Sequence, residues 1–145
     1  MDFEQIENKI VDQLKASLTY VRTIETYAGQ LETDIESLPI RFPAIYVMYS
    51  GSQLEWVDGQ ANYNEVDVFT VLAAAKNLKG NEAVRKDTEI GCYKMIKDVL
   101  AQIANKNFSL DIEKMRPTEI RLIYISSFVA IYGIEFQTNF DKVYS

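Results

Sequence analysis

The first third of the chain changes from a helical to a strand-like spacing of apolar residues. Across residues 3–18 apolar side chains recur at intervals of three and four, which predicts an amphipathic helix. This stripe is more typical of a core face than of a partner-binding face. Residues 19–27 are rich in β-branched and aromatic residues and predict a strand. Residues 30–38 return to helical spacing and predict a short helix, which Pro39 ends.

The middle of the chain alternates between apolar runs and turn residues. Residues 44–49 are apolar on both faces, which predicts a strand that is covered on both sides and ends at Gly51. Residues 53–57 and 62–75 predict a hairpin around an Asp58-Gly59 turn, because glycine tolerates a positive φ. The second arm begins polar and ends apolar. We therefore expect the hairpin to project beyond the sheet at its polar end.

The last part of the chain predicts one long helix and then strands. Residues 82–104 carry an apolar stripe at helical spacing. Gly91 lies inside this helix, where it costs about 1 kcal/mol relative to alanine and would permit close packing on a sheet. Strands are expected at 109–113, 119–126 and 129–138, and the last two are close enough in sequence to form a hairpin.

The order of these elements predicts an α+β fold. We expect a mixed or antiparallel sheet that packs against the N-terminal helix and one long helix and carries a projecting β-hairpin. The chain has 145 residues, the usual size of one domain, and contains no linker-like segment. A single domain over residues 1–145 is therefore the expectation.

Charge and cysteine content exclude several classes of protein. The formal net charge is −6 and the basic residues are scattered, so we expect no sequence-specific nucleic-acid binding, since tight binding draws much of its affinity from neutralising phosphates. The N-terminus has neither the basic flank nor the apolar centre of a signal peptide, and no run is long enough to span a bilayer. Cytoplasmic residence without membrane association is the expectation. Cys92 is the single cysteine, lies beside the apolar stripe, and is expected to be a small buried hydrophobe.

The sequence offers little catalytic chemistry. It contains no histidine, which removes the commonest general base and the commonest metal ligand. It also lacks the glycine-rich loops that bind phosphates. Two groups of carboxylates remain, but we interpret them as solvated surface, since such groups are common and catalysis also needs a pocket. No catalytic residue, metal or cofactor is therefore expected. These carboxylates are Glu32, Asp34 and Glu36 in one group and Glu55 and Asp58 in the other.

The predicted hairpin tip has the composition of a contact surface. Trp56 and Tyr63 flank the turn at Asp58, at the polar end of the hairpin. Aromatic residues in such a position either belong to the core or anchor an interface. We therefore take Trp56, Asp58 and Tyr63 as the candidate residues of an oligomer interface.

Several scattered segments resemble a known family, and the order of the elements agrees with it. The chain resembles the Mu-like phage and prophage family of small tail or neck proteins, whose members look like tail terminators. The residues that carry the resemblance are Tyr27-Ala28-Gly29-Gln30-Leu31, Phe42-Pro43-Ala44-Ile45-Tyr46-Val47 with Gly51, Val71-Leu72-Ala73-Ala74-Ala75-Lys76-Asn77, Arg85, and Gly91-Cys92-Tyr93.

The resemblance implies a structural role in a virion. Tail terminators form rings, commonly hexamers, that cap the tail tube and present a surface to the head–tail connector. The implied partners are further copies of the chain, the tail tube protein and the connector. The implied location is the bacterial cytoplasm during assembly and then the virion tail. Such a ring needs a head-to-tail interface that closes.

Three other interpretations remain open from the sequence. The chain could be another head–tail adaptor or tail-assembly protein of the same particle. It could be a small ligand-binding α+β domain unrelated to phage, which would show a concave apolar pocket. It could also be an enzyme that uses carboxylates alone, which a stabilising divalent cation would reveal.

Overall fold

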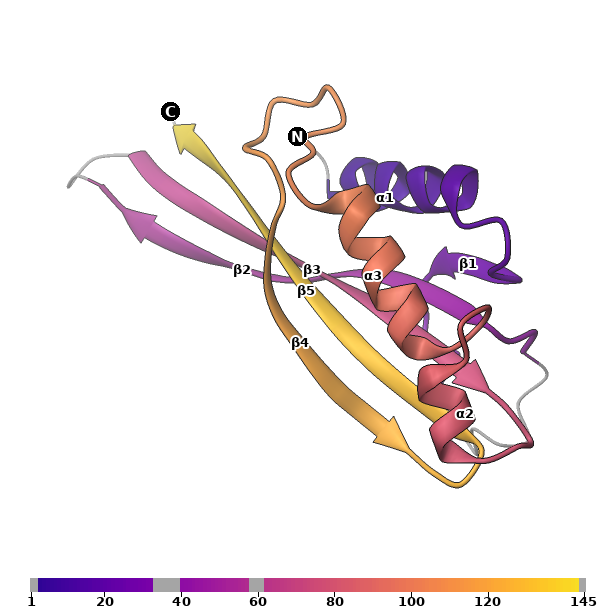
Figure 1. Cartoon of the computed structure of the whole chain (residues 1–145). Coiled ribbons are helices and arrows are strands. Elements are labelled where there is room, and N and C mark those ends of the chain that lie inside the picture. The colour runs from indigo at the N-terminus through magenta and orange to yellow at the C-terminus, as the bar shows by residue number, and fades with distance from the viewer. Residues whose placement is uncertain (1–2, 33–39, 58–61, 144–145) are drawn as a thin grey trace.

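A computed structural model describes residues 3–32, 40–57 and 62–143 and gives three helices and five strands within them. Figure 1 shows the helices gathered on one side of a long twisted sheet. The elements in chain order are α1 (Phe3–Ser17), β1 (Thr23–Thr26), β2 (Ala44–Trp56), β3 (Asn62–Lys76), α2 (Asn81–Lys86), α3 (Cys92–Ile103), β4 (Arg116–Ile125) and β5 (Val129–Val143).

The sheet is mixed, with the strand order β1-β2-β3-β5-β4. Strand β1 runs parallel to β2, and all other neighbours are antiparallel. Helices and strands are segregated rather than alternating in βαβ units, so the fold is α+β, as predicted. Strand β4 forms one edge of the sheet. The other edge is formed by β1 and, beyond the short pairing with β1, by β2.

The helices cover one face of the sheet, which we call the helix face. Ile6, Ile10 and Leu14 of α1 are fully buried against it, so the apolar stripe of this helix is a core face, as expected. Met95 and Val99 of α3 are equally buried over β3 and β5. Because α1 and α3 also contact each other, the two helices share one continuous core with the sheet.

The other face, which we call the opposite face, has a smaller core. Tyr46 and Leu72 are buried there, and Ile40 and Phe42 pack on them. Tyr27 meets the ring of Tyr46 edge-on, with ring centroids 5.9 Å apart. The described parts of the chain between β1 and β2 thus cover part of this face.

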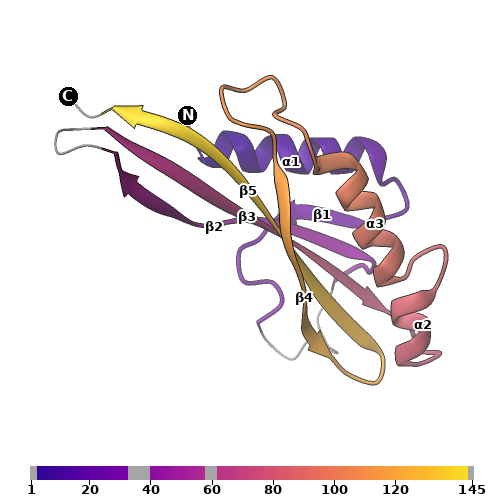
Figure 2. The same cartoon turned by 60° about the vertical axis from the view of Figure 1, so that its left-hand side comes forward.

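Three strands extend beyond the helices as an arm, which Figure 2 shows from the side. The predicted strands at 44–49 and 53–57 are a single strand, β2, and Gly51 does not end it. The register shifts between Tyr49 and Gly51, where Gly51 adopts a φ of 124°, so the glycine makes a bulge that the strand passes through. The predicted hairpin is present, because β2 pairs with β3 as far as Trp56 and Tyr63.

The predicted long helix is interrupted. It consists of α2 and α3, which a turn around Asp87 separates. The Asp87 carboxylate accepts hydrogen bonds from the backbone N–H groups of Glu89 (2.8 Å) and Ile90 (3.1 Å), which hold the turn and keep the pKa of Asp87 below its usual value. Gly91 then starts α3 with its N–H on the Asp87 carbonyl (2.9 Å). Apolar spacing continues across the break, which is why the sequence predicted one helix.

Other predicted boundaries also change. Of the strand predicted at 19–27 only Thr23–Thr26 pairs with a neighbour. The strand predicted at 109–113 is absent, because Phe108 and Ser109 have positive φ values and the segment is a loop. The final strand β5 is five residues longer than predicted, since β3 pairs with it along its whole length.

The helix predicted at 30–38 can be compared with the structure only in part. Residues 30–32 form a turn, in which the N–H of Glu32 donates to the Gly29 carbonyl (3.2 Å). The rest of the prediction, together with Pro39, lies outside the described residues.

Candidate functional site

The predicted interface residues lie on the arm but differ in accessibility. Trp56 is 56% exposed, whereas Tyr63 is 2% exposed, and their rings are in contact with centroids 5.1 Å apart. Tyr63 therefore packs inside its own subunit, and Trp56 is the member of the pair that a neighbouring molecule can reach. Asp58 lies outside the described residues.

The arm is a firm extension of the core, because polar side chains anchor its helix face. Ser52 donates to the buried carboxylate of Asp67 (2.5 Å), and the Tyr49 hydroxyl is hydrogen-bonded to Ser52. Phe3 stacks on Tyr49 with ring centroids 4.0 Å apart. These contacts connect the base of the arm to the start of α1.

The α3–β4 loop also holds the arm in place, through contacts with strand β5. The buried hydroxyl of Thr138 on β5 donates to the Glu113 carbonyl (2.5 Å), and the Glu113 N–H donates to the Asn139 carbonyl (3.1 Å). Buried hydrogen bonds of this kind are costly to break, so the arm keeps a defined direction.

The strand β4 is exposed along its whole length. Each of its ten residues is exposed, including five large apolar ones, and α3 packs on β3 and β5 instead. Among the described residues no strand pairs with its outer edge. A long apolar edge strand is a ready site for pairing with another chain. The five apolar residues are Ile120, Leu122, Ile123, Tyr124 and Ile125.

Sequence reasoning placed this strand but missed its position at the edge. A run that is apolar on both faces is typical of a central, covered strand. A second bulge, between Leu122 and Tyr124, also places Tyr124 on the opposite face rather than beside Leu122. The composition of β4 is thus that of a covered strand, although no described element covers it.

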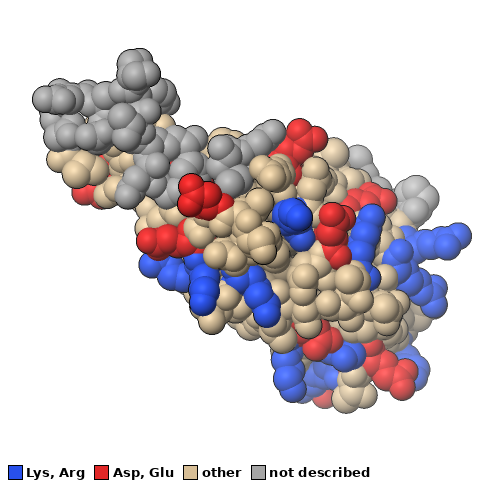
Figure 3. Space-filling model, turned by 90° about the horizontal axis from the view of Figure 1, so that it is seen from above, with Lys and Arg blue, Asp and Glu red and all other residues tan. Residues whose placement is uncertain are grey.

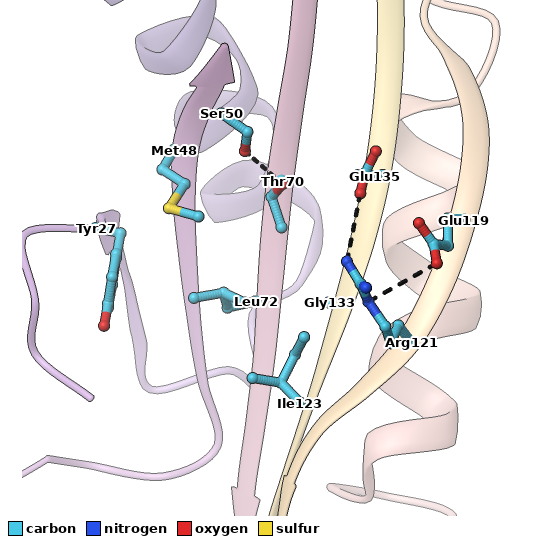
Figure 4. Close-up of a pocket in the computed structure, with 10 residues that line it drawn as sticks. All are labelled: Tyr27, Met48, Ser50, Thr70, Leu72, Glu119, Arg121, Ile123, Gly133 and Glu135. Carbon is cyan, nitrogen blue, oxygen red and sulfur yellow. Dashed lines mark hydrogen bonds and ion pairs between the residues drawn. The ribbon is translucent and has the colours of Figure 1, made fainter. Parts of the chain in front are cut away.

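A hollow of about 380 Å³ lies on the opposite face beside β4 (Figure 4). Its floor includes Gly133, whose missing side chain leaves space under Ile123. Arg121 reaches toward Glu119 (3.7 Å) and Glu135 (3.8 Å) along one wall. These ion pairs are solvent-exposed and contribute little stability. The hollow has mixed polar and apolar walls and joins the exposed surface of β4.

The thiol that the sequence singled out is inaccessible. Cys92 is fully buried, and burial raises the pKa of its thiol to about 12. A thiol in this state is a poor nucleophile, because the thiolate is the reactive form. Cys92 fills space in the core, as expected.

Only two of the five candidate carboxylates lie in the part of the chain that the structure describes. Glu32 and Glu55 are exposed, and Asp34, Glu36 and Asp58 lie outside the described residues. Within the described ranges no three acidic or cysteine side chains are close enough together to hold a metal ion. In the same part of the chain no helix is long and apolar enough to cross a membrane.

The residues that carried the resemblance have identifiable structural roles. Arg85 donates to the Tyr93 hydroxyl (2.8 Å) and to Asn81 (2.8 Å), which joins α2 to α3. Asn81 donates in turn to the Ser126 carbonyl at the β4–β5 turn (2.9 Å). These side chains hold the helical layer on the end of the sheet.

An α+β sheet with an anchored arm and an uncovered apolar edge strand is typical of a structural protein that assembles with other chains. The sequence matches the family described as Bacteriophage Mu, Gp37, over residues 2–141, and the chain belongs to this family. It is thus a phage structural protein, which agrees with the resemblance seen in the sequence. No curated protein matches the chain.

Proposed function

We propose that this protein is a tail terminator of the phage neck, which closes into a ring on the tail tube and joins the tail to the head. Its partners are then further copies of the chain, the tail tube protein and the head–tail connector. It acts in the bacterial cytoplasm during assembly and remains in the virion tail. A hexameric ring is the expected form.

The exposed edge strand β4, opposite an anchored arm, supports this proposal most directly. A ring subunit needs two different surfaces that fit each other, so that the contact repeats head to tail and closes. Strand β2 forms one edge of the arm, and β4 forms the opposite edge of the sheet. The family membership supplies the virion context.

The arrangement of charge is compatible with a ring through which DNA passes. In Figure 3 acidic and basic side chains are interspersed over the face in view, and they do not gather into one basic patch. The net charge of −6 disfavours adhesion to phosphate. A lumen lined by such a surface would let DNA slide.

Tail length is the measurement that tests the function. In a prophage with this gene deleted, electron microscopy of the induced lysate should show tails that are longer than normal and variable, together with unattached filled heads. A plasmid copy of the gene should restore uniform tails. The gene with Trp56→Ala should restore them less well than the gene with Leu78→Ala, since Leu78 is also apolar and is more exposed but lies in the β3–α2 turn.

A second function is distinguished by the same experiment. If tails of normal length accumulate beside unattached heads, the chain is a head–tail adaptor rather than a terminator. In that case the purified protein should sediment with filled heads and not with tail tubes. Normal, infectious particles in the deletion would exclude both roles.

A further inference from the structure

The two edges of the sheet have matching features. The outer edge of β2 is paired with β1 over Ala44–Val47, and the Glu7 carboxylate of α1 then accepts the N–H of Tyr49 (2.7 Å). Along Ser50–Glu55 the structure shows no further pairing of this edge with described residues. The outer edge of β4 is open in the same sense over Ile120–Ile125.

Their exposed apolar side chains lie on the same face of the sheet. Leu54 on β2 is opposite Glu65 of β3, which belongs to the helix face, and Leu54 is 51% exposed. Ile120 is opposite the core residue Ile134, and Leu122 is opposite Tyr132, so both also lie on the helix face, 48% and 43% exposed. A sheet that continued from one molecule into the next would bring these apolar groups together.

The charges on the opposite face favour one register of this pairing. Glu55 is opposite Asn64 and lies on the opposite face of the arm. Arg121 lies on that same face of β4, where it contacts Glu119 (3.7 Å). In antiparallel pairing Glu55 would meet Arg121 when Leu54 lies opposite Leu122, but would meet Glu119 when Leu54 lies opposite Ile120. Charge therefore favours the register that places Leu54 opposite Leu122.

The directions of β2 and β4 are compatible with a sheet that continues from one molecule into the next. Strand β4 is antiparallel to β5, which is antiparallel to β3, which is antiparallel to β2. Strand β4 is therefore antiparallel to β2. A second molecule that extends the sheet in the same sense would place its β2 antiparallel to β4, the commoner kind of pairing.

We infer that copies of this chain join head to tail by strand pairing, with the β4 edge of one molecule taking up the β2 edge of the arm of the next. The occupant of the apolar edge is thus a second copy of this chain. The contact uses two different surfaces, so each molecule keeps one of each free for a further neighbour, and the assembly can close into a ring. The inference rests on the proposed function for that closed ring.

Some features of β4 restrict the pairing to one part of the strand. Pro117 lies near its start, and the first bulge follows, between Pro117 and Glu119; both features oppose edge pairing. The six residues Ile120–Ile125 contain one charge, at Arg121. This stretch is where the second molecule is expected to bind.

Disulfide cross-linking between two single-site variants tests the inference. Leu54→Cys and Leu122→Cys proteins are mixed at high concentration under copper–phenanthroline oxidation, and mixed dimers are followed by non-reducing electrophoresis and mass spectrometry. Cys92 is buried, so the native thiol stays silent. The matched control replaces Leu122→Cys with Leu78→Cys, which is more exposed but lies away from both edges. The expected result is at least about a tenfold faster Leu54–Leu122 product, the factor that 1.4 kcal/mol of preferential contact gives.

The cross-link is a reliable report on contact between molecules. Within one chain the two positions lie on strands separated by β3 and β5, at least about 14 Å apart at the usual strand spacing. That separation is beyond the roughly 7 Å limit for the Cα atoms of a disulfide. Both residues are half exposed, so the replacements should leave the fold intact.

Two results would overturn the inference. One is a Leu54–Leu122 product that forms no faster than the Leu54–Leu78 control. The other is a dominant Leu122–Leu122 product, which would mean that two β4 edges pair symmetrically. As a second readout, Ile120→Glu should lower the mass seen by light scattering, while Leu78→Glu should not.

Failure of the edge pairing is distinguishable from failure of the proposed function. Sedimentation of the wild-type protein with purified tail tubes reports on the function without reference to the contact between copies. If the protein binds tube ends but cross-links elsewhere, the function stands and the edge pairing is wrong. If the edges cross-link but the protein does not sediment with tail tubes, the edge pairing stands and the proposed function is wrong.

Discussion

At Gly91 the backbone packs tightly against the backbone of residues 85–87 in the preceding turn. A Cβ built at this position would lie 2.6 Å from both the N and the O of Asp87 and 2.9 Å from the Arg85 carbonyl oxygen. Backbone atoms cannot move aside as a flexible side chain does. The glycine therefore permits the tight turn between α2 and α3.

Gly91→Ala should destabilise the protein by about 1–3 kcal/mol, the usual cost of overpacking. Urea unfolding followed by circular dichroism measures this change. Gly133→Ala is the matched control, because its added Cβ would meet the end of the Ile123 side chain at 3.3 Å, which can shift. An equal loss in both variants would mean that the close approach at Gly91 does not limit the turn.

Cys92 should make the protein less stable at high pH. Burial raises the pKa of its thiol from the ordinary value of 9.0 to about 12. The folded state then keeps a proton that the unfolded state loses, so the stabilising contribution is complete below pH 9 and is lost progressively as the pH rises toward 12. Thermal unfolding at stepped pH should show this decline.

The matching variant for that pH series is Cys92→Ala. Its melting temperature should fall less steeply above pH 9 than that of the wild type, although its stability at pH 7 is lower because a small cavity forms. Parallel curves for the two proteins would assign the decline to tyrosines such as Tyr46, whose pKa burial raises to about 12.

At the scale of the elements, Tyr20, which follows α1, contacts Lys94 and Asp98 of α3. We call these three residues the polar clamp. The Tyr20 hydroxyl donates to Asp98 (2.6 Å), and Lys94 contacts the same carboxylate (3.0 Å) while its ammonium lies 4.6 Å from the centroid of the Tyr20 ring. Burial alone would raise the pKa of Asp98, but these two donors hold it below its usual value. The clamp fixes the angle between the two helices on the sheet.

Tyr20→Phe should cost about 1 kcal/mol of stability at pH 7, since it removes one hydrogen bond to a partly exposed charged group. The pKa of Asp98 should rise toward its ordinary value, which carboxyl-carbon NMR can follow. Because the folded pKa of Asp98 is lowered, its contribution is present at neutral pH and is lost as the pH falls through that lowered value. The difference between variant and wild type should therefore shrink in acid.

Tyr124→Phe is the control for the clamp, because its hydroxyl lies on the exposed β4 strand. Its stability should match that of the wild type within about 0.5 kcal/mol. A loss as large as that of Tyr20→Phe would show that the clamp contributes nothing specific.

For the whole molecule, the distribution of charge predicts that the protein does not bind duplex DNA. The chain carries 15 basic and 21 acidic residues, so long-range electrostatics oppose contact with a duplex. In a gel-shift assay at physiological salt, duplex DNA should run unchanged in the presence of the protein. Binding that weakens steeply with added salt would contradict this expectation, because it would reveal phosphate neutralisation by a local cluster.

The sequence by itself determined the class of fold and most of its elements. The stripe of α1, the hairpin of β2 and β3 and the β4–β5 hairpin all follow from local spacing and turn residues, which act within a few positions of one another. The absence of histidine and the single cysteine likewise followed from composition. The family was visible in scattered structural residues, of which Arg85 and Tyr93 prove to bond directly.

Only the tertiary structure decided where each strand lies in the sheet. The apolar run of β4 is as apolar as a central strand, yet the order β1-β2-β3-β5-β4 places it at an edge. The prediction ended a strand at Gly51, whereas pairing with the distant strand β3 carries β2 through this position as a bulge. It also ran one helix through Asp87, where the local cap on Glu89 breaks the helix although apolar spacing continues. Whether a side chain such as Tyr63 faces its own core or a neighbour is likewise fixed by long-range packing. Local spacing cannot encode it, because the same residue pattern serves both positions.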